Sequence, residues 1–67
     1  MRVGKIQKDV LTYLARCGES GGVICTTTKA PEFHGYDLEQ VERAISGLLR
    51  RNIIRREGIR YILEGVP

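Results

Sequence analysis

Arginine is concentrated in one short stretch of this sequence. Residues 43–60 hold six arginines and a single acid, Glu57, a net charge of +5. Residues 1–42 hold five basic and six acidic side chains, so the overall charge of +3 hides a polarised molecule. A guanidinium group can bind phosphate or guanine through two parallel hydrogen bonds. We therefore expect an anionic partner at these arginines, which are Arg43, Arg50, Arg51, Arg55, Arg56 and Arg60.

The remaining reactive side chains form no recognisable catalytic or metal site. His34 is the only histidine, and its spacing from Cys17 and Cys25 is unlike that of any zinc motif. There is no glycine-rich phosphate loop and no paired-carboxylate site. We predict no enzyme activity, no metal and no cofactor. Cys17 and Cys25 are expected to be small buried residues, with a disulfide between them as the alternative if the source is a hyperthermophile.

A helix with a well-defined start is predicted over residues 37–51. Asp37 and Gln40 have the spacing of a capping box, and Tyr36 and Val41 that of a hydrophobic staple. The apolar positions recur at three- and four-residue intervals, which places them on one face directed to a core. They are Leu38, Val41, Ala44, Ile45, Leu48 and Leu49.

The opposite face of this helix is polar. Gln40 and Arg51 lie at one margin and Glu42 at the other. Its centre carries Glu39, Arg43, Ser46, Gly47 and Arg50. Taken alone, this face could be a solvated surface with a weak Glu39–Arg43 ion pair.

A β-hairpin is predicted directly after the helix. Residues 53–56 and 59–63 are rich in β-branched and aromatic side chains, and Gly58 tolerates the positive φ of a tight turn. If Glu57 and Gly58 form the loop, Arg55 faces Arg60 across the hairpin. Two like charges so placed are unfavourable unless an anion or solvent screens them. We therefore interpret Arg55 and Arg60 as a candidate phosphate clamp.

The N-terminal third is predicted to form a helix over residues 3–17 that stops at Gly18. Its buried stripe is Ile6, Val10, Tyr13, Leu14 and Cys17, with Val3 at the margin. Leu11 and Ala15 fall on the far side of this helix. They are either isolated surface apolar residues, which are common, or the contact of a homodimer.

The middle of the chain is predicted to be irregular. A loop over residues 18–22 leads to a short strand over 23–26. Pro31 suits the start of a single helical turn over residues 30–34, with Phe33 anchoring it in the core. The polar residues before this turn could contact phosphate or could be a plain connector; they are Thr26, Thr27, Thr28 and Lys29.

The segment from Leu48 to Leu63 reads LLRRNIIRREGIRYIL and follows the form L-L-x-x-x-x-I-x-R-x-G-x-x-Y-x-L. With the helix that precedes it, this segment resembles the recognition helix and wing of winged helix-turn-helix DNA-binding domains. The resemblance implies a single α+β domain over residues 1–67, with three helices and a small antiparallel sheet of the short strand and the hairpin. Residues 27–35 depart from the family, because they lack the leucine and alanine pattern of its second helix. A domain of this size also resembles the small transcriptional regulators of archaeal viruses, plasmids and phages.

This resemblance implies sequence-specific binding of double-stranded DNA, with the helix over residues 37–51 in the major groove. The predicted base contacts are Glu39, Gln40, Arg43 and Ser46. The predicted backbone and wing contacts are Thr27, Thr28, Lys29, Arg50, Arg51, Arg55, Arg56 and Arg60. The alternative is a winged-helix module that docks an acidic protein surface, because Glu39 and Glu42 would repel phosphate. RNA binding ranks last, since the core and the staple already use most of the aromatic side chains.

The composition is that of a globular protein. Apolar residues make up 42% of the chain, and no apolar run is long enough to span a membrane. The N-terminus lacks the apolar segment of a signal peptide. We therefore expect a small intracellular protein with no membrane partner, and no small-molecule ligand is evident.

Overall fold

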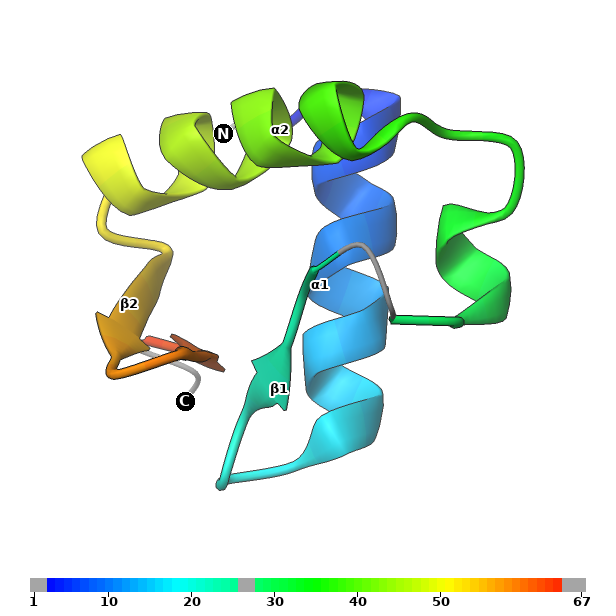
Figure 1. Cartoon of the computed structure of the whole chain (residues 1–67). Coiled ribbons are helices and arrows are strands. Elements are labelled where there is room, and N and C mark those ends of the chain that lie inside the picture. The colour runs from blue at the N-terminus through cyan, green and yellow to red at the C-terminus, as the bar shows by residue number, and fades with distance from the viewer. Residues whose placement is uncertain (1–2, 26–27, 65–67) are drawn as a thin grey trace.

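The computed structural model describes residues 3–25 and 28–64. Along the chain lie α1 (Lys5–Cys17), β1 (Gly22–Val23), η1 (Pro31–Phe33), α2 (Leu38–Arg50), β2 (Ile54–Glu57) and β3 (Arg60–Leu63). In Figure 1, α2 lies across the top of the molecule and crosses α1, and the sheet and η1 lie on opposite sides of α1. The α+β class and the small antiparallel sheet are thus confirmed. No described helix is long and apolar enough to cross a membrane.

One apolar core joins the two helices to the hairpin. The buried cluster consists of Val10, Leu14, Val41, Ala44, Ile45, Leu48 and Ile54. The helical members belong to the apolar faces predicted for the two helices, and Ile54 belongs to the predicted hairpin. Together they hold α2 against α1 and β2. Leu11 packs partly buried against the same cluster, so its placement on the far side of α1 was wrong. Ala15 is exposed as expected.

Both α-helices begin at side-chain caps. The Asp37 N–H donates to Gln40 Oε1 at 2.9 Å, which is one half of the predicted capping box. At α1, the Gly4 N–H donates to Gln7 Oε1 at 3.0 Å. This bond places the first helical residue at Lys5 rather than at residue 3. Gly18 closes α1 as predicted, with φ +83° and its N–H donating to the Leu14 carbonyl at 3.2 Å.

Two α-helices are present in the described residues, not three. The segment before α2 forms only the 3-10 turn η1, within the single turn predicted over residues 30–34. Pro31 favours the start of a turn, but it also biases the residue before it away from helix. Gly35, with φ +89°, ends the turn two residues after Phe33. The span from Pro31 to Gly35 is too short for an α-helix.

The sheet has the strand order β1-β3-β2, and all of its pairs are antiparallel. The two-residue loop of the hairpin is Gly58-Ile59, not Glu57-Gly58. Consequently Arg55 lies opposite Ile62, and Glu57 lies opposite Arg60. The predicted Arg55–Arg60 pairing was therefore wrong, although both residues remain on the face of the hairpin that they were assigned. Each partner has moved by two positions, and a shift of two preserves the alternation of a strand.

The first strand is shorter and earlier than the predicted strand over residues 23–26. It ends at Val23 because the Val23 carbonyl accepts hydrogen bonds from Tyr13 Oη at 3.1 Å and Thr28 Oγ1 at 2.9 Å. Thr26 and Thr27 lie outside the described residues. The strand begins at Gly22, where an added Cβ would lie 2.7 Å from Cys17 Sγ. The glycine is thus what allows the strand to approach α1 so closely.

Candidate nucleic-acid interface

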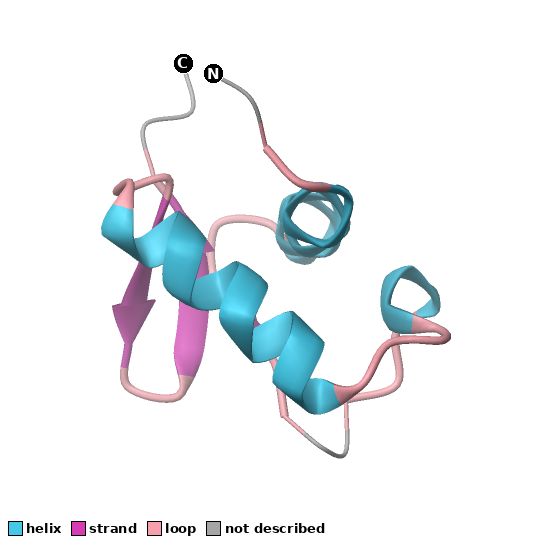
Figure 2. Cartoon of the chain, turned by 90° about the horizontal axis from the view of Figure 1, so that it is seen from above, coloured by secondary structure: helices cyan, strands magenta, loops and turns pink. Residues whose placement is uncertain are grey.

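The polar face of α2 is exposed along the whole helix. Glu39, Arg43, Ser46 and Arg50 follow one another at intervals of three and four residues and are all exposed, as is Gln40. The core side chains of α2 point the other way, so this face is directed to solvent. In Figures 1 and 2 no other described element covers the outer side of α2. The four predicted base-contacting residues therefore share one accessible helix face.

Arg43 is held by a weak ion pair within this face. Its Nη2 lies 2.9 Å from Glu39 Oε1, and about four-fifths of each side chain is exposed. An i, i+4 pair in water contributes little to stability. The guanidinium is thus oriented along the helix and can still exchange Glu39 for another acceptor.

Gln40 has a structural task besides its predicted contact. Its Oε1 already accepts the Asp37 N–H at the start of α2. A bidentate contact to adenine uses both the oxygen and the nitrogen of the amide. The amide nitrogen is available for donation, whereas the oxygen would have to share a lone pair with the cap.

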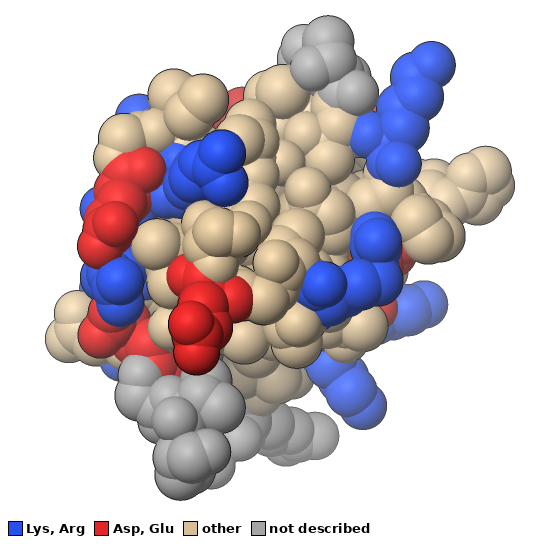
Figure 3. Space-filling model, turned by 90° about the horizontal axis from the view of Figure 1, so that it is seen from below, with Lys and Arg blue, Asp and Glu red and all other residues tan. Residues whose placement is uncertain are grey.

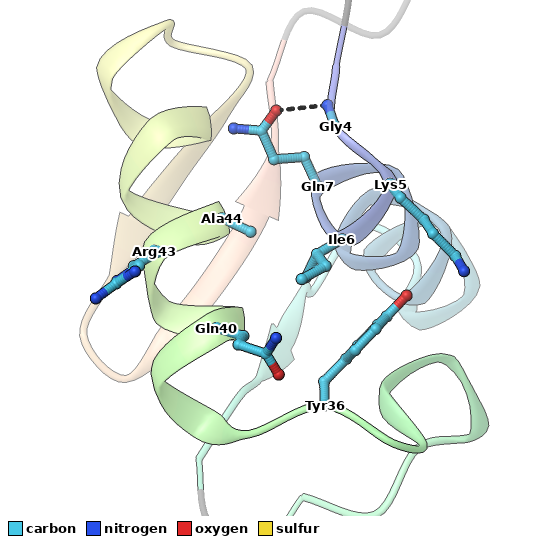
Figure 4. Close-up of a pocket in the computed structure, with 8 residues that line it drawn as sticks. All are labelled: Gly4, Lys5, Ile6, Gln7, Tyr36, Gln40, Arg43 and Ala44. Carbon is cyan, nitrogen blue, oxygen red and sulfur yellow. Dashed lines mark hydrogen bonds between the residues drawn. The ribbon is translucent and has the colours of Figure 1, made fainter.

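A shallow hollow of about 630 Å³ lies between the N-terminal parts of α1 and α2. Figure 4 shows Ile6 and Ala44 between the two helices, while the Arg43 side chain points away from the hollow. Nothing in the sequence indicated this hollow, because its walls come from residues about 35 positions apart. Its lining is Gly4, Lys5, Ile6, Gln7, Tyr36, Gln40, Arg43 and Ala44.

The outer face of the hairpin carries a charge-balanced cluster. Arg55 Nε lies 2.7 Å from Glu57 Oε2, and Arg55 Nη1 donates to Glu64 Oε1. Glu64 and then Glu57 raise the pKa of Arg55 by hydrogen bonding to its guanidinium. Glu57 is also the cross-strand neighbour of Arg60. The anion that the phosphate-clamp hypothesis required is thus supplied by the protein itself, and the clamp interpretation is abandoned.

The other arginines of the hairpin and the helix end are accessible. Arg56 is exposed, and its Nε donates to the Gly58 carbonyl at 2.9 Å, so the guanidinium lies over the loop. Arg50, Arg51 and Arg60 are exposed. Arg50 and Arg60 form no ion pair with any residue in the described part of the chain.

Only some of the residues predicted to contact phosphate before η1 are exposed. Lys29 is exposed. Thr28 is half-buried, and its hydroxyl donates to the Val23 carbonyl and accepts the Cys25 N–H at 3.0 Å. Because its only proton is committed, Thr28 is a structural residue of this turn. The predicted contact at Thr27 lies outside the described residues.

Long-range side-chain hydrogen bonds fix the segment before α2 to α1. Tyr36 Oη donates to Asp9 Oδ2 at 2.5 Å, which links the segment before α2 to α1. Arg16 forms two hydrogen bonds, of 2.9 and 3.0 Å, with the Glu32 carboxylate of η1. The Tyr13 and Phe33 rings pack with centroids 5.0 Å apart, which confirms Phe33 as the anchor of the turn. These ties were missed in the sequence, because their partners lie far apart along the chain.

The cysteines are not joined by a disulfide, and the described residues contain no cluster of metal-ligating side chains. Cys17 is half-buried beside Gly22. Cys25 is exposed rather than buried, and its Sγ lies 3.6 Å from Thr28 Oγ1. Because Leu11 is used by the core, a homodimer through α1 would have to rely on Ala15 and its exposed neighbours, and it remains a prediction.

Figure 3 shows the face of the molecule that lies away from α2. Acidic and basic groups adjoin one another on one side of this face, and basic side chains project from the other across mostly uncharged surface. Positive charge is therefore not gathered into one continuous patch there. The exposed face of α2 lies on the opposite side of the molecule.

No family model, curated protein or solved structure matches this chain.

Proposed function

We propose that this protein is a winged helix-turn-helix DNA-binding protein that acts as a transcriptional regulator. The observation that carries the proposal is the polar face of α2, which is exposed from Glu39 to Arg50 beside a hairpin that bears arginine. The antiparallel pairing of β1 with β3 also agrees with the small sheet that the family resemblance implies. The reduced second helix is where the chain departs from that pattern.

In this proposal α2 enters the major groove. Its 13 residues span roughly 20 Å, and the groove is about 12 Å wide, which is enough for a helix. Arg43 leaves Glu39 and forms two hydrogen bonds with guanine O6 and N7. Glu39 orients Arg43 in the free protein, and the Gln40 amide nitrogen donates to a neighbouring base. Ser46 and Arg50 follow the groove toward phosphate.

The proposed role of the hairpin is narrower than the sequence alone implied. Arg56 and Arg60 contact the flanking backbone, because neither forms an ion pair with a described residue. Arg55 instead ties β2 to the end of β3 through Glu57 and Glu64. Its acidic partners make the surface around it unfavourable for phosphate.

Fluorescence anisotropy with a pool of duplexes tests this proposal, with Arg43→Ala as the variant and Arg55→Ala as the matched control. Each bidentate base contact contributes about 1–3 kcal/mol to discrimination, so Arg43→Ala is expected to reduce the preference among duplexes by roughly 5- to 150-fold. Arg55→Ala should retain the preference and the salt dependence. If Arg43→Ala keeps the wild-type preference, α2 does not read bases.

A second candidate function is the docking of an acidic protein surface. It is favoured by Glu39 and Glu42, which are exposed on α2 and would repel phosphate. The same titration separates the two functions. Affinity no better than the nonspecific range of roughly 10⁻⁴ to 10⁻⁶ M for every duplex would favour the protein partner.

A further inference from the structure

The tip of the hairpin is apolar and exposed. Ile59 has 71% of its surface exposed and is the one exposed large apolar side chain among residues 3–25 and 28–64. It is the second residue of the two-residue loop between β2 and β3. Gly58, with φ +63°, supplies the positive φ that a type II′ hairpin turn needs at its first position. Loop geometry thus explains Gly58 but not an isoleucine beside it.

Arginines lie on both strands beside this tip, and the acid directly before the loop, Glu57, forms an ion pair of 2.7 Å with Arg55. The hydrogen bond from Arg56 Nε to the Gly58 carbonyl holds the Arg56 guanidinium over the loop. Arg60 opens β3 on the other side of the loop and is exposed. A single exposed apolar residue is ordinary, but one that is placed between two arginines at a protruding turn suits a narrow anionic groove.

The position of the tip relative to α2 indicates which groove this would be. In Figure 2 the β2–β3 loop extends to the side of α2 that faces away from α1. With α2 in a major groove, a neighbouring element reaches the adjacent minor groove across one phosphate backbone. That groove is about 6 Å wide, too narrow for two strands about 4.8 Å apart with their side chains, but wide enough for one side chain from a loop.

We propose that Ile59 enters the minor groove as an apolar wedge and partly unstacks one base step, while the Arg56 guanidinium contacts the phosphate backbone at the edge of the groove. This inference rests on the DNA-binding function proposed above. Minor-groove proteins insert isoleucine and similar side chains between base pairs in this way, and the step is most easily opened where a pyrimidine precedes a purine. The wing would thus select flexible DNA without a hydrogen bond to any base.

The salt dependence of binding distinguishes the contribution of the wedge from that of phosphate contacts. An apolar contact releases no counterions, whereas each arginine–phosphate contact contributes about 0.9 to the slope of log affinity against log salt. Ile59→Ala is therefore expected to weaken binding by roughly tenfold with an unchanged slope. Arg56→Ala is expected to lower the slope by about 1.

The experiment uses duplexes with 2-aminopurine placed in turn at each step that flanks the α2 site. Wild type and Ile59→Leu, the control that keeps the apolar volume, should raise the 2-aminopurine fluorescence at one step. Ile59→Ala should leave it unchanged. All three proteins are checked for folding by thermal unfolding, and the high exposure of Ile59 predicts similar melting temperatures.

Several outcomes would overturn the inference. If wild type binds a preferred duplex but Ile59→Ala matches it in affinity and in fluorescence at every step, the tip stays outside the groove. If wild type sediments as a dimer and Ile59→Ala as a monomer, Ile59 is a contact between copies of the chain. If wild type prefers no duplex at all, the proposed function itself fails, and this result is distinct from the other two.

Discussion

Single side chains decide how the N-terminal end of α2 is held. Tyr36 connects the residue before the helix cap to Asp9 on α1, and Gln40 closes the cap from inside the helix. The Asp9 carboxylate accepts a hydrogen bond only from the neutral phenol. This bond, followed by burial and by the carboxylate charge, raises the pKa of Tyr36 above its ordinary value. The tie that orients α2 is therefore sensitive to alkaline pH.

Tyr36→Phe tests this tie. A group whose pKa is raised by folding stabilises the protein fully below its unfolded-state pKa, about 10 for tyrosine, and loses this contribution as the pH rises through the folded-state value. Wild type should thus be more stable than Tyr36→Phe at neutral pH. The difference should shrink as the pH rises above about 10 and through the raised pKa of Tyr36. Urea unfolding of both proteins across this range measures it.

The comparison with Tyr36→Phe isolates this residue, because the pKa of Tyr13 is also raised, mainly by burial, and is shared by both proteins. A stability difference that stays constant from neutral to strongly alkaline pH would show that the phenol proton is not involved.

The hairpin and β1 show how an element can be predicted in outline and wrong in detail. The strands and the glycine turn were evident from residue types, but Gly58 can serve as either residue of a two-residue loop. Both placements keep Ile54 on the inner face and Arg55 on the outer face, so alternation could not decide between them. The observed Gly58-Ile59 loop places Glu57, not Arg55, opposite Arg60. The outer face is therefore a charge-balanced cluster and not a phosphate clamp.

Gly21 is the residue on which the attachment of β1 to the hairpin depends. It has φ +74°, and an added Cβ would lie 2.3 Å from the Tyr61 carbonyl oxygen and 2.6 Å from Ile62 Cγ1. Gly35 has a similar φ of +89° with nothing within 4 Å, so it provides a matched control. Gly35→Ala is expected to cost about 1–2 kcal/mol from the backbone alone. Gly21→Ala should cost at least about 1–3 kcal/mol more, because a backbone carbonyl must move.

Thermal and denaturant unfolding of the two glycine variants measures this difference. Equal losses in the two variants would mean that β1 can shift away from β3 without cost and that the sheet edge is loosely held.

Across the molecule, local sequence patterns predicted the helices well, but the long-range side-chain hydrogen bonds could not be predicted. Helical periodicity and the Asp37–Gln40 spacing placed α2 to within one residue at each end, because both signals act over a few residues. Arg16 and Glu32 are 16 residues apart, and Asp9 and Tyr36 are 27 apart. No short-range signal marks such pairs. The family resemblance predicted a second α-helix that is absent, whereas Pro31 correctly indicated a single short turn there.

The charge of the molecule is less one-sided in space than along the sequence. Residues 43–60 carry +5, yet Arg43 is paired with Glu39, and Arg55 with Glu57 and Glu64. Within residues 43–60, the positive charge outside these ion pairs therefore lies at the C-terminal end of α2 and at the tip of the hairpin. A DNA-binding surface built this way would depend on the fit of α2 to a groove more than on total charge.

Amide chemical-shift mapping with a preferred duplex tests the central claim most directly, because a chain of 67 residues gives a resolvable spectrum. We predict that the largest changes fall in residues 39–50 of α2 and residues 56–60 of the hairpin. The exposed side of α1, marked by Lys8, Thr12 and Ala15, should be unaffected. Changes concentrated on α1, with α2 unperturbed, would contradict the proposal that α2 reads DNA.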